Sequence, residues 1–290
     1  MKFTKMHGCG NDYVYIDGVH EQIADHPHAA ISFSNRHFGV GSDGLIFINP
    51  STKADFEMEM YNADGSRAEM CGNGIRCVGK YVYDHHLTDK TTLHIDTLAG
   101  IKTLYLTVKD NAVSEVTVNM GAPILKPELI PVATEKLKGV DRIINYPLTV
   151  AEKEFKVTCV SMGNPHAVVF IDRDQKTLPL EELGPLFENH PFFPKRVNTE
   201  FVRVTDRKHV DMRVWERGSG ETFACGTGAC AVCVACVLNR RTDDEIEIRL
   251  QGGILRVRWD RESNQVFMTG PAVTVFEAET TDIQDPIRNF

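Results

Sequence analysis

The sequence lacks both an excess of positive charge and a long apolar run. Its 40 Asp and Glu residues outnumber its 32 Lys and Arg residues, for a formal net charge of −8 at pH 7, and no basic stripe with interleaved aromatic residues is found. Nucleic acids and anionic membranes are therefore not expected as partners. The most apolar segment, residues 225–238, is too short to span a bilayer. Residues 1–8 lack the apolar stretch of a secretory signal, so a cytoplasmic protein is expected.

Signatures of cofactor and metal binding are missing as well. No GxGxxG opens a helix after a strand, no HExxH is present, and there are no two separated C-x2-C pairs. Cys230, Cys233 and Cys236 form one C-x2-C-x2-C run, but at about 100° per residue their sulfurs would spread by roughly 120° around a helix. We therefore expect no cofactor and no metal, and we interpret the run as small, buried helix residues.

What the chain does contain is an internal repeat. Gly10-Asn11 is matched by Gly163-Asn164, and Cys71-Gly72-Asn73-Gly74 is matched by Cys225-Gly226-Thr227-Gly228, at nearly the same offset and in the same order. Order and spacing together favour a duplicated domain over a coincidence among the 22 glycines. The length agrees, because 290 residues correspond to about two domains of ~150 residues each.

Each half is expected to contain several strands and one central helix that begins at its Cys-Gly-x-Gly. In the first helix Ile75, Val78 and Val82 share one face, whereas residues 229–238 are apolar on every side, which is typical of a buried helix. Composition and alternation predict strands at residues 13–17, 45–49, 56–61, 103–108, 113–120, 157–160, 167–171, 199–204, 210–215, 245–250, 255–259 and 273–277.

The fold class that follows is mixed α/β (α+β), with two similar domains. Each domain is expected to be a mixed sheet curled around a central helix, and a pseudo-twofold axis would relate the two. The boundary is placed after Met120, so that the N-terminal domain spans residues 1–120 and the C-terminal domain spans residues 121–271.

A cysteine at the start of a helix can be chemically reactive. The N–H groups of the first turn have no intrahelical partners, and the aligned peptide dipoles place roughly +0.5 charge there. Glycines let a carboxylate approach this backbone, and a thiolate is stabilised, so the pKa of the thiol can fall from about 8.5 toward neutrality. One such cysteine could equally be a redox thiol, a nucleophile or a packed helix residue.

Two such cysteines in a duplicated protein, Cys71 and Cys225, suggest a more specific chemistry. If both helix starts face one cleft, the α-carbon of a bound amino acid lies between two sulfurs. One sulfur then removes the α-proton and the other delivers a proton to the opposite face, which inverts the stereocentre. The pair needs one thiolate and one thiol, so it should titrate as a coupled unit. We predict a cofactor-independent amino-acid epimerase whose substrate is a small molecule.

Asparagines near strand ends are candidates for holding that amino acid. The four are Asn11, Asn62, Asn164 and Asn198. Each alone is typical of turn capping, but together they offer the donors and acceptors that a zwitterion needs.

Three charged or titratable residues lie near the repeated signatures. Glu216 places a carboxylate shortly before Cys225, and Arg217 offers a guanidinium that could bind a second carboxylate in a bidentate way. A surface ion pair is the simpler alternative for these two residues. His166 is structural in most settings, but beside a thiol it could tune ionisation.

These motifs resemble those of the diaminopimelate epimerases, over nearly the whole chain. The matching segments are residues 6–12, 62–66, 71–74, 161–166, 197–199, 216–218, 224–228 and 269–272. The resemblance implies a fold of two similar α/β domains, each a mixed sheet around a central helix. It also implies the interconversion of LL- and meso-diaminopimelate without a cofactor, on the route to lysine and cell-wall peptide, by an enzyme expected to be a homodimer.

The resemblance implies roles residue by residue. Cys71 and Cys225 would be the acid–base pair, and His166 and Glu216 would modulate their ionisation. Backbone amides for the reacting carboxylate would come from Gly72, Asn73, Gly226 and Thr227. The distal end of the substrate would be held by Asn62, Asn164, Asn198 and Arg217, with Asn11 and Glu216 also lining the site.

Two departures from the family and one assignment of the tail complete the comparison. Cys9 stands where many members have an apolar residue, and Gly44 stands where many have Gln, which puts one substrate contact in question. By the same resemblance, the tail of residues 272–290 would return to the first domain.

Two alternatives remain open. A proline racemase or hydroxyproline epimerase would share the two cysteines but would need no group for a distal carboxylate, so Arg217 and the asparagines discriminate against it. A thiol redox or metal-binding protein would rest on the eight cysteines, and a metal assay would test it.

Overall fold

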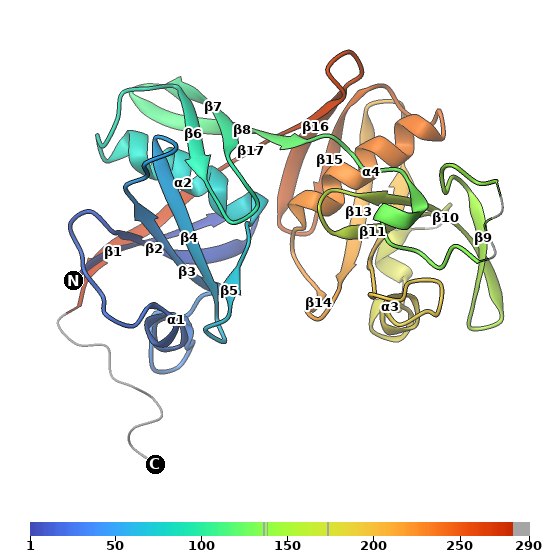
Figure 1. The fold of residues 1–290 in the computed structure, drawn as a ribbon, viewed down its shortest axis with the longest axis horizontal. Coiled ribbons are helices and arrows are strands. Elements are labelled where there is room, and N and C mark those ends of the chain that lie inside the picture. The colour runs from blue at the N-terminus through green and yellow to red at the C-terminus, as the bar shows by residue number, and fades with distance from the viewer. Residues whose placement is uncertain (136, 138, 173, 281–290) are drawn as a thin grey trace. The chain divides into compact units, whose positions relative to one another are not determined.

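Strands make up most of the regular structure, as the β-branched and aromatic content of both halves predicts (Figure 1). The computed structural model describes residues 1–135, 137, 139–172 and 174–280. Each strand predicted from the sequence overlaps an observed one. Within these described residues, no helix is long and apolar enough to span a membrane.

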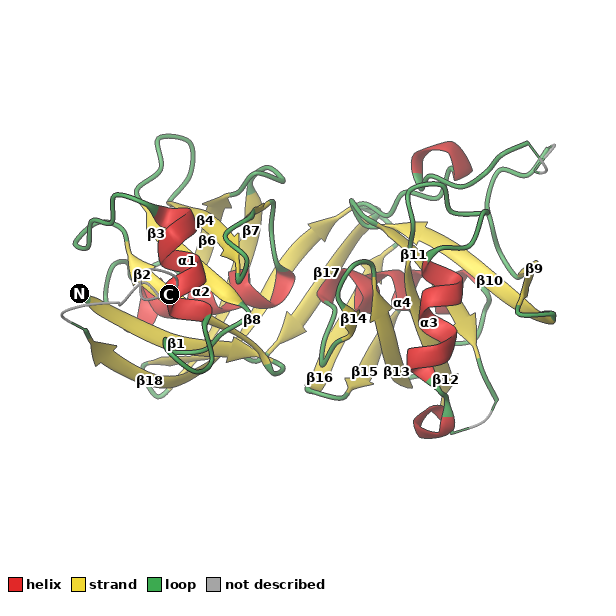
Figure 2. Ribbon diagram, turned by 90° about the horizontal axis from the view of Figure 1, so that it is seen from below, coloured by secondary structure: helices red, strands yellow, loops and turns green. Residues whose placement is uncertain are grey.

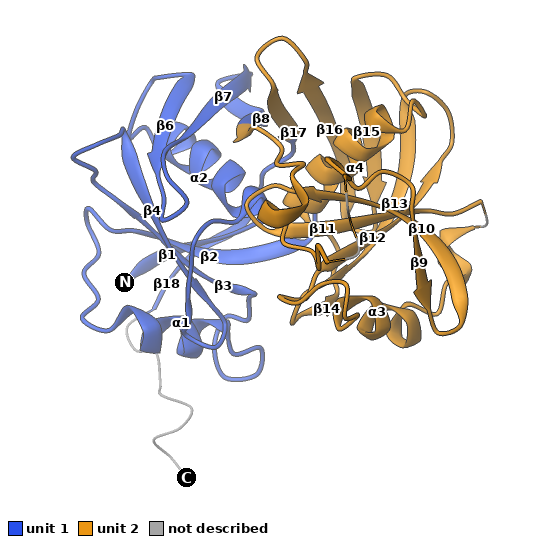
Figure 3. Cartoon of the chain, turned by 45° about the vertical axis from the view of Figure 1, so that its right-hand side comes forward, with its two compact units in different colours: residues 1–118, 270–290 blue, residues 119–269 orange. Residues whose placement is uncertain are grey.

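The chain divides into two compact units (Figure 3). The first contains residues 1–118 and the segment that returns from Gly270, and the second contains residues 119–269. The domain boundaries expected after residue 120 and at residue 272 lie close to these junctions. The last part of the expected tail, residues 281–290, lies outside the described residues.

The first unit is one mixed sheet with two helices. Its strands are β1 (Lys2–Gly8), β2 (Asn11–Asp17), β3 (Gly44–Asn49), β4 (Phe56–Asn62), β5 (Arg67–Ala68), β6 (Thr92–Asp96), β7 (Lys102–Lys109), β8 (Ala112–Gly121) and β18 (Val273–Glu279). Its helices are α1 (His26–Ser34) and α2 (Gly72–Asp84). The returning strand β18 pairs with β1 in the antiparallel sense, which places it in this unit.

The second unit repeats this plan. Its strands are β9 (Tyr146–Val150), β10 (Lys153–Ser161), β11 (Pro165–Phe170), β12 (Asn198–Val204), β13 (His209–Glu216), β14 (Gly220–Glu221), β15 (Glu245–Leu250), β16 (Gly253–Asp260) and β17 (Gln265–Gly270). Its helices are α3 (Leu180–Glu188), α4 (Gly226–Leu238) and the short 3-10 turns η1 (Pro127–Leu129) and η2 (Gln175–Thr177).

Strand pairing confirms the duplication inferred from the sequence. In the first unit, β1 and β2 are antiparallel, β2 and β3 are parallel, β3 and β4 are antiparallel, and β4 and β6 are parallel. In the second unit, β10, β11, β12, β13 and β15 follow the same alternation. Even the edge strands correspond, because β18 pairs with β1 as β9 pairs with β10.

One helix in each unit is surrounded by the sheet and another lies outside it (Figure 2). Helix α2 packs against β1, β2 and β7, and α4 packs against β10, β11, β12, β15 and β16. Because each central helix contacts strands from both ends of its sheet, each sheet is curled around its helix. The predicted fold class, two similar mixed α/β units with central helices, is confirmed.

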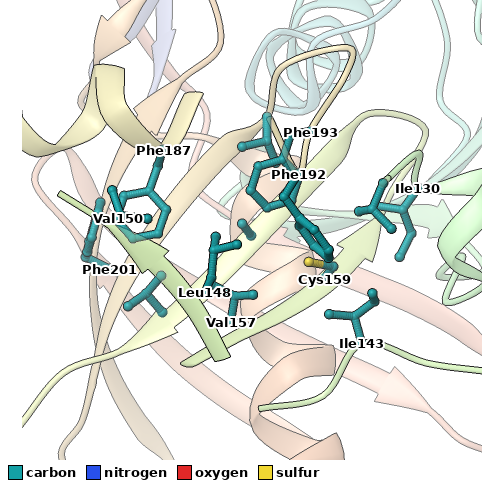
Figure 4. Close-up of a cluster of buried hydrophobic side chains, with 14 of the residues drawn as sticks. Ile130, Ile143, Leu148, Val150, Val157, Cys159, Phe187, Phe192, Phe193 and Phe201 are labelled. Atoms are coloured by element: carbon teal, nitrogen blue, oxygen red, sulfur yellow. The ribbon is translucent and has the colours of Figure 1, made fainter. Parts of the chain in front are cut away.

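Buried apolar side chains pack the helices against the sheets. Ile75, Val78 and Val82 of α2 are fully buried, and Cys230 to Cys236 of α4 are buried on every side of the helix. On the outer face of the sheet of the second unit, Phe187 of α3 packs with Phe201 in a cluster of buried hydrophobic side chains (Figure 4). The central helices are thus fixed in the interior. Their packing against the sheet determines where their N-terminal ends lie.

Candidate active site

In the first unit, Cys71 lies at the N-terminus of the central helix α2. The backbone of Cys71 is extended (φ −124°, ψ 121°), so the helix starts at the next residue and Cys71 is its N-cap. The Sγ atom accepts a hydrogen bond from the Gly74 N–H at 3.4 Å, as expected beside first-turn amides without helical partners. The thiol also donates to Oδ1 of Asn11 at 3.1 Å. The structure therefore brings Cys71 and Asn11, two of the expected site residues, into contact.

Asn11 is oriented by a carboxylate that the sequence did not single out, Asp43. The parallel pairing of β2 and β3 brings the starts of these strands together, and Asp43 directly precedes β3. Nδ2 of Asn11 donates to Oδ2 of Asp43 at 2.7 Å. Burial raises the pKa of Asp43. Arg36 donates to its other oxygen at 2.9 Å.

Asn73, Asn62 and Gly44 complete this end of the first sheet. Nδ2 of Asn73 donates to Oδ1 of Asn11 at 3.4 Å. Asn62 ends β4 opposite Gly44, and its Nδ2 donates to Oγ of Ser66 at 3.0 Å. A Cβ atom at Gly44 would lie 2.1 Å from the Tyr61 carbonyl oxygen. The backbone here leaves no room for a side chain at position 44.

In the second unit, Cys225 is the N-cap of α4 in the same way. Its Sγ accepts from the Gly228 N–H at 3.3 Å and lies 3.5 Å from Oγ1 of Thr227. The expected fall of its pKa toward neutrality is wrong for this state of the protein. Burial raises the pKa of Cys225 well above its usual value, and the charges of Glu216 and Glu200 raise it further. The helix-start amide does reach the sulfur, but desolvation outweighs it.

Glu216 ends β13 beside this buried thiol. Thr222 donates a hydrogen bond to Glu216 from its hydroxyl group, and the Cys225 thiol donates a second. Burial raises the pKa of Glu216. A carboxylate that accepts a hydrogen bond from the thiol and is poorly solvated is well placed to take the thiol proton.

His166 and Asn164 are connected to Thr227, next to Cys225, by hydrogen bonds. Nδ1 of His166 is 2.6 Å from Oε1 of Glu200, and both side chains are fully buried. Nε2 of His166 is 3.0 Å from Oδ1 of Asn164, whose Nδ2 donates to Oγ1 of Thr227 at 3.2 Å. A chain of hydrogen bonds thus leads from Glu200, a residue the motifs did not reveal, to the side chain beside Cys225.

Asn198 and Arg217 are linked to each other. The Arg217 N–H donates to Oδ1 of Asn198 at 2.9 Å, and Nδ2 of Asn198 donates to the Pro165 carbonyl. The Arg217 guanidinium is exposed and donates to the Lys195 carbonyl at 3.0 Å. Within the described part of the chain it forms no ion pair with a carboxylate, so its charge is available to a ligand.

Comparison with known proteins identifies the family. The family model described as "Diaminopimelate epimerase" matches residues 3–126 and 158–275. The chain belongs to this family. Diaminopimelate epimerase of Agathobacter rectalis is 58% identical over 282 residues, which cover 96% of this chain and 99% of the relative. That of Acetivibrio thermocellus is 56% identical over 279 residues, covering 96% and 98%. The resemblance drawn from the sequence motifs is confirmed.

Solved structures with low sequence identity share the fold of this diaminopimelate epimerase family member. A phenazine biosynthesis protein of the PhzF family from Bacillus anthracis has a TM-score of 0.69 at 19% identity, covering 97% of this chain and 99% of that one. A hydroxyproline epimerase from Agrobacterium vitis has a TM-score of 0.67 at 15% identity, covering 99% and 92%. The same fold therefore occurs in a phenazine biosynthesis protein and in a hydroxyproline epimerase.

Four further cysteines of the chain are buried among packed side chains. Cys230, Cys233 and Cys236 are fully buried in α4, and the Cys233 thiol donates to the Val257 carbonyl at 3.5 Å. Burial raises the pKa of Cys236 to about 12. Cys9 is also buried, and Arg76 donates to its sulfur at 3.8 Å. In the described residues, no group of three or more His, Cys, Asp or Glu side chains is arranged to hold a metal ion.

Proposed function

We propose that this chain epimerises LL-2,6-diaminopimelate to meso-diaminopimelate, a step toward lysine and peptidoglycan precursors, by acid–base chemistry at two cysteines. The family assignment supports the substrate. The observation that supports the mechanism is the repeated placement of a cysteine Sγ at the capped start of a central helix, with Gly74 N–H at Cys71 and Gly228 N–H at Cys225. No cofactor takes part.

The proton inventory of the reaction follows from the side chains beside each sulfur. Glu216 takes the proton of the Cys225 thiol, which leaves a Cys225 thiolate and a protonated Glu216. The thiolate removes the α-proton of the substrate, and the Cys71 thiol delivers its own proton to the opposite face. In the reverse direction the roles of Cys71 and Cys225 are exchanged. His166, through Asn164 and Thr227, adjusts the ionisation of Cys225.

Substrate binding divides between the reacting centre and the distal end. The backbone amides of the two helix starts, at Gly72, Asn73, Gly226 and Thr227, receive the carboxylate at the reacting centre, because first-turn N–H groups favour anions. Asn62, Asn164, Asn198 and Arg217 hold the distal amino and carboxylate groups, and Asn11 and Glu216 line the site.

Exchange with solvent tests the mechanism directly. LL-diaminopimelate incubated with the protein in D2O should gain deuterium at one α-carbon while it converts to the meso form, because the delivered proton comes from a thiol that exchanges with water. Mass spectrometry and NMR of the product measure the incorporation. Epimerisation without solvent deuterium in the product would rule out the two-thiol mechanism, and preference for proline as substrate would favour the proline racemase alternative.

Arg217 tests the substrate assignment. We expect Arg217→Lys to lower kcat/KM for diaminopimelate by about 100-fold, because an ammonium group does not replace a bidentate guanidinium. The exposed position of Arg217 means that the melting temperature should stay close to that of the unchanged protein. Arg203→Lys, at another surface position of the same unit, is the control. Equal kcat/KM for Arg217→Lys and the unchanged protein would remove Arg217 from the distal site.

We place the enzyme in the cytoplasm and propose that it is a homodimer. Its eight cysteines are thiols, and such a set suits a reducing compartment. The returning strand β18 exposes three apolar side chains, Val273, Val275 and Phe276, and exposed apolar groups of this kind support a surface for self-association.

A further inference from the structure

Asp43 is a half-buried carboxylate whose two oxygens face different donors. Oδ2 accepts from Nδ2 of Asn11 at 2.7 Å and from the Asp12 N–H at 3.2 Å, and Oδ1 accepts from Arg36 at 2.9 Å. An ionised carboxylate can only accept hydrogen bonds. At this contact, Asp43 can therefore pair with Nδ2 of Asn11, which is a donor, but not with Oδ1, which is an acceptor.

This contact determines which end of the Asn11 amide faces Cys71. With Nδ2 turned to Asp43, Oδ1 points to the sulfur and accepts from the Cys71 thiol at 3.1 Å. The same oxygen accepts from Nδ2 of Asn73 at 3.4 Å, which favours the same orientation. A reversed Asn11 amide would place a donor against both the thiol and Asn73.

An acceptor beside a sulfur and a donor beside a sulfur have opposite effects. An acceptor stabilises the thiol because only the thiol has a hydrogen to donate, whereas a donor stabilises the thiolate. The Gly74 N–H is a donor to Cys71, so Asn11 opposes the influence of the helix start. Orientation of one amide thus changes how readily Cys71 ionises.

We propose that Asp43 is a positioning residue for the acid–base reaction: by fixing the Asn11 amide, it keeps the proton on Cys71. Asp43 acts through Asn11 and does not contact the sulfur in this role. The proposal rests on the proposed function, because a proton retained on Cys71 is the one delivered to the substrate when Cys225 acts as the base.

Charged and titratable groups around Asp43 and Cys71 come from several elements. Arg36 and Asp12 lie beside Asp43, and Lys5 of β1 pairs with Asp12. The Tyr13 hydroxyl makes hydrogen bonds with both Asn11 and Cys71, and burial raises its pKa well above the usual value. Charged groups in this region also act on the ionisation of Cys71 through space. The test must therefore separate the electrostatic effect of the Asp43 charge from the role of Asp43 as a hydrogen-bond acceptor for Asn11.

Two substitutions at this position make that separation. Asp43→Asn removes the charge but leaves a carbonyl oxygen that can accept from Asn11. Asp43→Ala removes both the charge and the acceptor. The readout is the rate at which iodoacetamide alkylates Cys71 at pH 7, measured by peptide mapping, because the thiolate is the reactive form.

The positioning role predicts different results for the two variants. Asp43→Ala should raise the Cys71 alkylation rate by about tenfold, the change in thiolate fraction that corresponds to one pKa unit. Asp43→Asn should remain within about twofold of the unchanged protein, since an acceptor for Asn11 persists. In an Asn11→Ala background, Asp43→Ala should add nothing further, because the side chain through which it acts is gone.

Three outcomes would overturn the proposal. These are an unchanged alkylation rate in Asp43→Ala, an equal rise in both Asp43 variants, which would show a direct charge effect, or a full rise in the Asn11→Ala background. The rate of Cys225 alkylation in the same samples should stay unchanged, which distinguishes a local effect from loss of the fold. Alkylation requires no diaminopimelate, so failure of the proposed function would appear separately, as absent epimerisation by the unchanged protein.

Discussion

Alanine in place of Cys71 or Cys225, the proposed acid–base pair, is expected to abolish inversion in both directions while leaving α-hydrogen exchange in one stereoisomer. Each direction of the reaction needs one thiolate and one thiol, so loss of Cys71 or Cys225 should lower the rate of epimerisation by at least ~10³-fold, in the upper range for a general acid or base. The remaining cysteine can still remove the α-proton on its own face and return a solvent-derived proton to the same face.

The two variants should therefore select opposite stereoisomers. In D2O, one variant should exchange the reacting α-hydrogen of LL-diaminopimelate only, and the other that of the meso form only, each without change of configuration. NMR of the recovered amino acid measures both exchange and configuration. Cys236→Ala is the control, because Cys236 is a buried thiol of helix α4 that lies near the end opposite to Cys225. Exchange of both stereoisomers by one single-cysteine variant would contradict the assignment of one cysteine to each face.

The central features of the fold could be predicted from the sequence because local signals and tertiary structure agree there. Cys71 and Cys225 each precede glycines and an apolar helical segment, and both cap the central helices as expected. The strands with strong alternation, such as β13 and β15, are also present. In these segments side-chain periodicity and burial require the same structure.

The outer helices could not be predicted because tertiary packing stabilises them. Helix α1 begins with His26-Pro27-His28, which gives no apolar stripe. Helix α3 contains Gly184 and Pro185, both poor helix formers. A Cβ atom at Gly184 would lie 2.2 Å from the ring of Trp215, so the glycine is needed for close packing on β13. That partner is distant in the sequence and leaves no local signal.

The same limit applies to the candidate site. The motifs revealed residues that belong to the repeated signatures, such as Asn11 and Asn164. Asp43 and Glu200 are absent from those signatures, and each reaches its partner through the parallel pairing of neighbouring strands, β2 with β3 and β11 with β12. The sign of the pKa shift at Cys225 was also out of reach, because burial depends on the whole unit.

Glu216→Gln is expected to lower kcat/KM by about 100- to 1000-fold, since a glutamine cannot take the proton of Cys225. The pKa of Cys225 is raised by burial, so without this base its thiolate forms only at high pH. The residual activity of the variant should therefore increase with pH across the alkaline range. Glu221→Gln is the control, because Glu221 is nearby in sequence but is paired with Arg213 at 2.7 Å.

The pH profile of the unchanged enzyme provides an independent check on Glu216. Burial raises the pKa of this carboxyl group, and Glu216 can accept a proton only in its ionised form, above that pKa. Activity should therefore fall as the pH is lowered through the raised pKa, at a higher pH than for an ordinary glutamate, whose pKa is about 4.3. In Glu216→Gln the inflection at this pKa should be lost, and activity should instead increase steadily with pH, because only the Cys225 thiol is left to titrate. An acidic limb that persists unchanged in the variant would mean that another group controls the thiol, and His166 with Glu200 would then be the pair to test.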